Sequence, residues 1–174
     1  NMAEAILGGL LAGDVASAGN LVASDIAQER RAWLQKEYGI DATPDNAAAA
    51  AGADVVVLAL KPQHAGDALR AARDAVTERQ LLVSICAGLP TSTLEGWVPA
   101  RVVRAMPNLP AMVRRSVTAI CAGARATGED MDAAEQIFES VGMVARMPEG
   151  KMNEVTALSG SGPGYVFAFM EALE

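Results

Sequence analysis

The sequence is poor in the residues that most often bind metal ions. It contains one histidine, two cysteines and only 4% aromatic residues in a chain of 174 residues. One histidine and two scattered cysteines are too few for a conventional zinc site. No apolar run reaches the roughly 18 residues that a membrane-spanning helix needs. We therefore expect neither a metal site nor a membrane span, and these residues show no signal-peptide pattern.

Positive charge is also scarce, because 14 basic residues face 21 acidic ones and the net charge is −7. Nucleic acids and anionic membrane surfaces are bound through basic surfaces, so we expect neither as a partner. Cys86 and Cys121 each lie in an apolar run. Such runs predict buried free thiols in a reducing compartment, and hence a cytoplasmic location.

The apolar residues that are present follow strand-like and helical spacings in turn. The run from Val55 to Leu60 is rich in β-branched residues and is typical of a parallel strand buried on both faces. Similar runs predict further strands at residues 20–24, 81–85, 101–105, 117–121 and 143–147. Strands and helices in alternation indicate an α/β fold, with a Rossmann-like, doubly wound, mostly parallel sheet and right-handed crossovers.

Helical stripes and end signals place the segments between these strands. Periodic apolar residues predict helices near residues 1–11, 25–38, 65–76 and 131–141. Gly39 is expected to end the second in a left-handed conformation. Thr43-Pro44 and a capping-box spacing over Ser92–Glu95 predict two short helices, and Thr127 with Asp130 predicts a capped one.

The strand pattern stops near residue 150. Residues 151–174 are expected to be helical, with an interruption at Ser159–Gly164. We therefore expect two parts. Residues 1–150 would form a dinucleotide-binding domain, and residues 151–174 would begin an all-helical domain.

The N-terminal segment matches half of a dinucleotide-binding fingerprint. Ala3 lies near a helix start, and Asp25 follows 22 positions later at a strand end. In the full fingerprint a glycine turn precedes this helix, and the acid meets the ribose. We expect the strand and the glycines to precede Asn1, in a longer polypeptide.

Three predicted strands end in loops that favour close approach of a ligand. They are Lys61-Pro62-Gln63, Cys86-Ala87-Gly88 and Met106-Pro107-Asn108. In an open α/β sheet, ligands bind outside the carboxyl ends of the strands. The sequence therefore predicts one binding crevice formed by these three loops.

Several of these motifs, in this order, resemble the pyrroline-5-carboxylate reductase family. The matching stretches are Asn1-Met2-Ala3, Ala59–Pro62, Ser84–Gly88, Arg104–Asn108 and Ala157–Tyr165. The resemblance implies reduction of the cyclic imine 1-pyrroline-5-carboxylate to L-proline, the last step of proline biosynthesis, with NADPH or NADH as cofactor. It also implies a homodimer or higher homo-oligomer, formed through a helical domain beyond residue 174.

Carried over residue by residue, the resemblance assigns roles along the crevice. Asn1, Met2 and Ala3 would complete the pyrophosphate turn, Ser24 or Asp25 would meet the adenosine ribose or its phosphate, and Asn46 would contact the adenine half. Contacts along the pyrophosphate and nicotinamide would come from Ala59, Leu60, Lys61, Pro62, Ile85, Cys86 and Ala87. Asn108 would lie near the nicotinamide and substrate, and Ser161 beneath the cleft. Both would position rather than exchange protons, since a protonated imine accepts hydride without a covalent nucleophile.

The cofactor preference stays open at this point. A carboxylate at Asp25 favours the free 2′-hydroxyl of NADH, whereas the family commonly uses NADPH. Arg30 and Arg31 lie a turn or more further on and are expected to compensate poorly. The chain also has Leu109 where the family usually has threonine and Gly164 where it usually has alanine.

Two alternatives compete with this interpretation. The first is another two-domain reductase, of the β-hydroxyacid dehydrogenase type, for which Lys151 lies too early to be the catalytic lysine. The second is a non-catalytic dinucleotide-binding protein. His64 is expected to be a surface or capping residue, while Asn153 and Glu154 are candidates to face the cleft.

Overall fold

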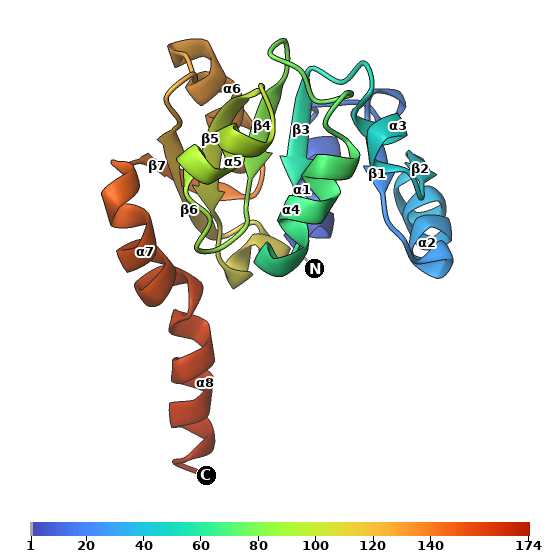
Figure 1. Cartoon of the computed structure of the whole chain (residues 1–174). Coiled ribbons are helices and arrows are strands. Elements are labelled where there is room, and N and C mark those ends of the chain that lie inside the picture. The colour runs from blue at the N-terminus through green and yellow to red at the C-terminus, as the bar shows by residue number, and fades with distance from the viewer. Residues whose placement is uncertain (1) are drawn as a thin grey trace.

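The β-structure of this protein falls into two sheets (Figure 1). The computed structural model describes residues 2–174, so the prediction for Asn1 lies outside the described residues. A five-stranded sheet has the order β3-β4-β5-β6-β7. Its strands are β3 (Val55–Leu58), β4 (Leu81–Ser84), β5 (Arg101–Met106), β6 (Ser116–Ala122) and β7 (Gly142–Arg146). A separate parallel pair is formed by β1 (Val22–Ser24) and β2 (Asp41–Thr43).

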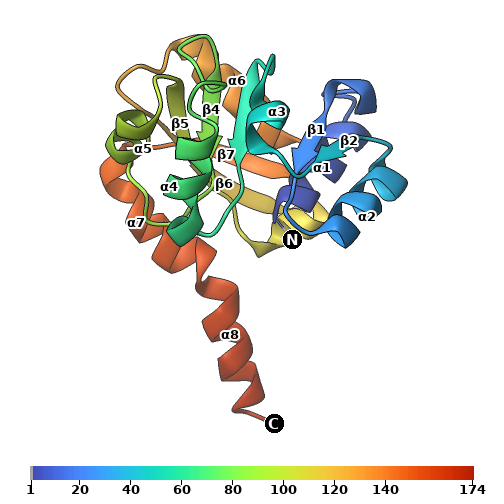
Figure 2. The same ribbon diagram turned by 45° about the vertical axis from the view of Figure 1, so that its right-hand side comes forward.

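Helices cover both faces of the larger sheet. Alternate side chains of a strand point to opposite faces, and those of β4 are apolar on both, so each face packs against helices. Leu81 and Val83 pack with α1 (Met2–Ala12) and α6 (Gly128–Glu139). Leu82, from the same strand, packs with α4 (Pro62–Ala71) and α5 (Thr91–Trp97). The smaller sheet carries α2 (Gln28–Tyr38) and α3 (Asn46–Ala50) at the side of the domain (Figure 2). The predicted α/β class with a mostly parallel sheet is confirmed.

One strand runs against its neighbour. β6 pairs antiparallel with β5 and parallel with β7. Met106, the last residue of β5, lies opposite Ala119, so the first residues of β6 extend past the carboxyl end of β5. Ser116 therefore reaches the same edge of the sheet as Asn108, although it begins a strand rather than ending one.

Several local predictions need correction. The strand expected at residues 20–24 is shorter, since Ala18–Asn20 form a 3-10 turn. The strand β2 was missed, and Asp45 rather than Thr43 caps α3 by accepting the N–H groups of Ala47 and Ala48. Helix α5 begins at Thr91 after Pro90, without a side-chain cap from Ser92.

Two of the predicted helix ends are confirmed. Thr127 and Asp130 form both bonds of a capping box at the start of α6. Gly39 ends α2 at a φ of 66°, a left-handed conformation in which glycine has no steric penalty. In both places the end signal was local, so the sequence was sufficient to predict it.

The last part of the chain is a broken helix that leaves the domain (Figures 1 and 2). The 3-10 turn Glu149–Lys151 leads into α7 (Met152–Val155), a π-helical turn (Thr156–Gly160) and α8 (Gly162–Glu171). At Gly160 an added Cβ would lie 2.7 Å from Met106 Cε, so a larger residue here would require the end of the Met106 side chain to move. The predicted interruption at Ser159–Gly164 thus corresponds to the π-helical turn and the start of α8. Between residues 2 and 174, no helix combines the length and apolar character required to cross a membrane.

Candidate functional site

A mostly apolar pocket of about 300 Å³ lies between β1 and β3. Side chains of α1 line it on one side, among them Ile6 and Leu10, and side chains of α4 line it on the other, among them Leu69. Within the described chain, β1 pairs only with β2 and β3 only with β4, so each strand has an unpaired edge. Six of the predicted cofactor residues line this pocket: Ala3, Ser24, Asp25, Asn46, Ala59 and Leu60. The structure therefore brings together residues that are up to 57 positions apart in the sequence.

The side chain of Arg31, in the first turn of α2, lies against the loop that follows β1. Nη1 of Arg31 donates to the carbonyl oxygens of Asp25 at 2.7 Å and of Ile26 at 3.0 Å. Arg31 therefore contacts the backbone of Asp25 and not its carboxylate, a contact that the spacing along the sequence did not predict. The first turn of α2 folds this long side chain back over the loop that precedes it.

The side chains of Asp25 and Arg30 form no hydrogen bond or ion pair with each other in the described structure, and each has a partner of its own. Oδ1 of Asp25 accepts the backbone N–H of Ala27 at 2.8 Å. Nη2 of Arg30 lies 2.7 Å from Oε2 of Glu4, and its guanidinium carbon is 4.4 Å from the centroid of the Trp33 ring. The hydrogen bond from Arg30 lowers the pKa of Glu4, although partial burial opposes the shift.

The ends of β3 and β4 lie against each other. The N–H of Ile85 donates to the carbonyl oxygen of Leu58 at 3.1 Å, and Sγ of Cys86 donates to that of Leu60 at 3.2 Å. Cys86 is only 1% exposed, and burial raises the pKa of its thiol. Any ligand contact at Cys86 must therefore come from its backbone. Lys61 and His64 are exposed, at the start of α4, and Pro62 and Ala87 are half-buried nearby.

Asn108 joins three segments of the chain. Its Oδ1 accepts the Ser116 hydroxyl and the Val117 N–H, both at 3.1 Å. Its Nδ2 donates to Oγ of Ser159, in the π-helical turn, at 2.9 Å. These bonds fix which way the amide of Asn108 faces. Ser161, the other predicted positioning residue, is exposed at the start of α8, and Ser159 makes the contact instead.

Ser116 and Thr118 are buried polar residues beside Asn108 that the sequence reasoning missed. The oxygen atoms of their two hydroxyls are 3.1 Å apart, and both side chains are at most 1% exposed. Two hydroxyl residues at alternate positions of a strand share one face. That spacing was visible in the sequence, but the direction of β6, which brings them to Asn108, was not.

A buried arginine ties the helical segment to the sheet. Arg104, on β5, is 3% exposed, and its Nη2 donates to Oδ1 of Asn153 at 3.1 Å. Its Nη1 lies 3.7 Å from Oε1 of Glu149. Glu149 also accepts the N–H of Thr91 at 2.7 Å and its hydroxyl at 2.8 Å. Burial, with the nearby charge of Glu149, raises the pKa of Cys121 to about 11.

The remaining candidates on this segment have structural partners. Asn153 faces Arg104 rather than an open cleft. Nζ of Lys151 pairs with the carboxylate of Glu154 at 2.9 Å, on the surface. Lys151 is paired with Glu154 and lies too early in the sequence to be the catalytic lysine, which disfavours the β-hydroxyacid dehydrogenase alternative.

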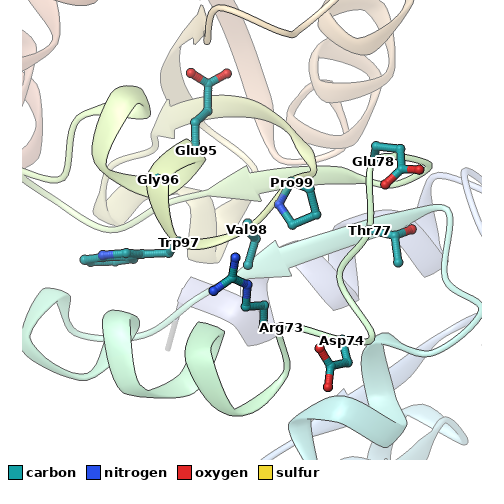
Figure 3. A pocket seen from close by; sticks show the side chains of 9 residues that line it. All are labelled: Arg73, Asp74, Thr77, Glu78, Glu95, Gly96, Trp97, Val98 and Pro99. Carbon is teal, nitrogen blue, oxygen red and sulfur yellow. The ribbon is translucent and has the colours of Figure 1, made fainter.

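A second pocket, of about 430 Å³, lies at the opposite edge of the sheet (Figure 3). Arg73, Asp74 and Thr77 precede β4, and Trp97 and Pro99 precede β5, so this pocket is at the amino ends of the strands. Its lining mixes both signs of charge. None of the predicted cofactor residues lines it.

The fold defines an α/β domain of the dinucleotide-binding class, in which ligands bind at the carboxyl ends of the strands. The model of the family described as "NADP oxidoreductase coenzyme F420-dependent" matches residues 1–88. The chain belongs to this family.

Known proteins similar to the whole chain carry the name predicted from the motifs. A pyrroline-5-carboxylate reductase of Pseudomonas aeruginosa is 42% identical over 176 residues, which cover 99% of this chain and 64% of that protein. One from Methanosarcina acetivorans is 38% identical, with the same coverage. The predicted resemblance is confirmed. The chain spans about 64% of the length of these curated relatives.

Solved structures of pyrroline-5-carboxylate reductases are also similar to this chain. A pyrroline-5-carboxylate reductase from Coxiella burnetii superposes with a TM-score of 0.91 at 34% identity, covering 99% of this chain and 65% of that one. The Plasmodium falciparum enzyme, solved with NADP bound, has a TM-score of 0.85 at 29% identity, covering 98% and 63%. A prephenate dehydrogenase from A. aeolicus, at 15% identity, a TM-score of 0.75 and coverage of 97% and 64%, shares the fold alone.

Proposed function

We propose that the complete product of the gene carrying this chain reduces 1-pyrroline-5-carboxylate to L-proline with NADPH or NADH. The proposal is supported chiefly by 42% identity to a pyrroline-5-carboxylate reductase over 99% of the chain. The bond from Asn108 to Ser159 adds to this, because it joins two motifs of the resemblance at one edge of the sheet.

The residues at the carboxyl edge fit a dinucleotide. Ser24 and Asp25 lie at the carboxyl end of β1, and Arg31 supplies a guanidinium against the loop that follows. Half-buried Ala59 and Ala87 present small side chains beside the ends of β3 and β4. A reduced nicotinamide bound there supplies a hydride.

The protein's own contribution to this reaction is alignment and exclusion of water. A protonated imine carbon is already electrophilic, so a fixed, half-buried amide is more useful than a strong base. Asn108 is such a group, since three hydrogen bonds to its side chain hold it in place. We assign it, together with Ser159, the role of holding the substrate and nicotinamide in register.

We also propose how the domains are arranged. Residues 1–150 form the dinucleotide-binding domain, and residues 151–174 begin the helical one. A further strand of the complete polypeptide, with the fingerprint glycines after it, fits between β1 and β3. Supporting this are the two unpaired strand edges and the apolar pocket that separates them.

The helix α8 exposes large apolar side chains. Among them are Phe167 at 58% and Phe169 at 65% exposure, which are available for contact with a second copy of the chain. We propose a homodimer or higher homo-oligomer built through this helical part.

We also propose a cytoplasmic location, because both cysteines are free and buried, as in reducing compartments.

The test is oxidation of NADPH and NADH at 340 nm with 1-pyrroline-5-carboxylate as substrate. The complete gene product should turn over, whereas residues 1–174 alone should not. Absence of turnover in the complete protein with either cofactor would refute the proposed reaction. Full turnover by residues 1–174 would refute the need for further segments.

A further inference from the structure

We infer that the hydroxyl of Ser159 donates a hydrogen bond to an oxygen of the bound ligand, and that the amide of Asn108 fixes this direction. The oxygen belongs to a carboxylate or to a carboxamide, the groups that the imine substrate and the nicotinamide respectively carry. The inference rests on the proposed function, because it gives a direction to a contact that the proposed function leaves undirected.

The amide of Asn108 can face only one way. A backbone N–H only donates, so the side-chain atom of Asn108 that lies 3.1 Å from the Val117 nitrogen must be the oxygen, Oδ1. The nitrogen Nδ2 is therefore the atom that faces Oγ of Ser159, at 2.9 Å. Because an amide NH₂ group donates and does not accept, Ser159 is the acceptor of this hydrogen bond.

Two buried hydroxyls on β6 support the same orientation. Thr118 is 0% exposed, and among the described residues its hydroxyl contacts one polar side chain, Oγ of Ser116 at 3.1 Å. A buried O–H without an acceptor is costly, so Thr118 donates to Ser116. Ser116 then gives its own hydrogen to Oδ1 of Asn108, at 3.1 Å. The hydrogen bonds from Thr118 to Ser159 thus all run in one direction.

The hydrogen of the Ser159 hydroxyl has no acceptor within the part of the chain that the structure describes. Thr156 lies in the same π-helical turn and differs in this respect, because its hydroxyl donates to the carbonyl oxygen of Met152 at 2.8 Å. Both side chains are half-buried. Of the two hydroxyls, that of Ser159 therefore keeps a donor for another molecule.

The position of this donor suits a ligand contact. Asn108 follows β5 at the carboxyl edge of the sheet, where ligands bind in open α/β folds. The hydrogen bond from Asn108 holds Ser159 at that edge, and π-helical turns are frequent at functional sites. A carboxylate only accepts hydrogen bonds, and the carbonyl oxygen of a carboxamide also accepts. Either oxygen matches a hydroxyl that already accepts from Asn108 and has its hydrogen left to donate.

The experiment uses the complete gene product with Ser159→Ala, and Thr156→Val as the matched control. The value of kcat/KM is measured with 1-pyrroline-5-carboxylate and with 1-pyrroline, which lacks the carboxylate. If Ser159 donates to the substrate carboxylate, Ser159→Ala should lower this value about 10- to 100-fold for the first substrate and less than about threefold for the second. Thr156→Val should change both values less than about threefold.

A binding measurement identifies the other source of the oxygen. If Ser159 donates to the nicotinamide carboxamide, Ser159→Ala should lower kcat/KM about three- to tenfold with both substrates. The Kd of NADPH or NADH, from calorimetric titration, should then rise by a similar factor. A purely structural role of Ser159 would lower kcat/KM with both substrates and leave the cofactor Kd unchanged.

The variant Asn108→Asp tests the direction of the bond. It keeps an acceptor for the Ser116 hydroxyl and the Val117 N–H, and the donors around it favour the ionised carboxylate. Its second oxygen accepts from Ser159 and cannot donate, so the hydrogen of Ser159 turns inward. Adding Ser159→Ala to this variant should therefore change kcat/KM less than about twofold further. Binding of NADPH, and of L-proline to the NADPH complex, gives the same comparison where turnover is too slow to measure.

Three outcomes would overturn the inference while the proposed reaction stands. They are an equal effect of Ser159→Ala with and without Asn108→Asp, an effect no larger than that of Thr156→Val, and the pattern of a purely structural role. A wild type that does not turn over 1-pyrroline-5-carboxylate overturns the proposed reaction instead. In that case the Kd of NADPH decides, and a value unchanged by Ser159→Ala overturns the inference as well.

Discussion

Nδ2 of Asn108 donates a hydrogen bond to Oγ of Ser159 at 2.9 Å, across 51 positions of the chain. The bond joins the loop after β5 to the π-helical turn that precedes α8. Because Oδ1 of the same amide holds Ser116 and Val117, the link is rigid at its sheet end. The helical segment is therefore positioned by the edge of the sheet at the carboxyl end of β5.

Asn108→Ala should cost more stability than removal of its partner. It removes three hydrogen bonds at once, those from the Ser116 hydroxyl and the Val117 N–H and that to Ser159, so we expect a loss of about 2 kcal/mol in the free energy of unfolding. Ser159→Ala removes one half-buried bond and should cost about 1 kcal/mol. Urea unfolding of the complete gene product measures both. The exposed Ser161→Ala is the matched control, expected within about 0.5 kcal/mol of wild type. An equal cost at Ser161 and Asn108 would contradict the assignment.

The ion pair of Arg104 and Glu149 should be coupled more strongly than a surface pair. Arg104 is buried, so its charge depends on this carboxylate and on the Asn153 side chain. A double-mutant cycle with Arg104→Met and Glu149→Gln should give a coupling energy of about 1–3 kcal/mol. The exposed pair Arg146 and Glu135 provides the control, with less than about 1 kcal/mol. Coupling at or below the control value would show that α7 is not held by this pair.

Asp130 should make stability depend on acid pH. Burial raises the pKa of this carboxyl, but the N–H and hydroxyl of Thr127 and the guanidinium of Arg101 outweigh it and hold the pKa below its usual value. A lowered folded-state pKa contributes stability that is present above the unfolded pKa of about 4 and is lost as pH falls through the lower folded value. Urea midpoints between pH 2 and 7 should therefore fall more steeply below about pH 4 in wild type than in Asp130→Asn. Parallel curves would show that the carboxylate contributes nothing.

Neither cysteine should be reactive in the folded protein. The pKa of Cys121 is raised to about 11, mainly by burial, and burial raises that of Cys86 as well. Since the thiolate is the nucleophile, alkylation by iodoacetamide at pH 8 should be roughly 100-fold or more slower in the native than in the urea-unfolded protein. Mass spectrometry after a timed quench gives both rates. Rapid labelling of native Cys86 would mean that the loop after β4 opens readily.

The same thiol shift predicts an alkaline loss of stability. The folded state keeps Cys121 protonated, so its contribution is fully present below the unfolded pKa of about 8.5 and declines as pH rises toward about 11. Cys121→Ala should lack this component. Thermal unfolding of both proteins from pH 7 to 11 compares them, and identical pH profiles would argue that the thiol ionises equally in both states.

The sequence by itself determined the elements whose signals are local. The capping box of Thr127 and Asp130, the left-handed Gly39 and the strand that begins at Val55 each depend on neighbours a few positions away, although only Leu58 of that strand is buried. The order of motifs was sufficient for the family resemblance, because spacing along the chain is a property of sequence. The loops at the carboxyl edge followed from the parallel pattern.

Only the tertiary structure decided the contacts that depend on the direction of a strand or on the length of a side chain. The antiparallel course of β6 brings Ser116 to Asn108, and strand direction is set by packing and not by strand propensity. Arg31 lies six positions from Asp25 in the sequence, but a long side chain in the first turn of α2 folds back to its carbonyl. The burial of Cys86 was expected from its apolar run, but its hydrogen bond to the Leu60 carbonyl comes from the close contact of β3 and β4. These relationships arise from a few ångströms of three-dimensional placement, which residue spacing alone does not encode.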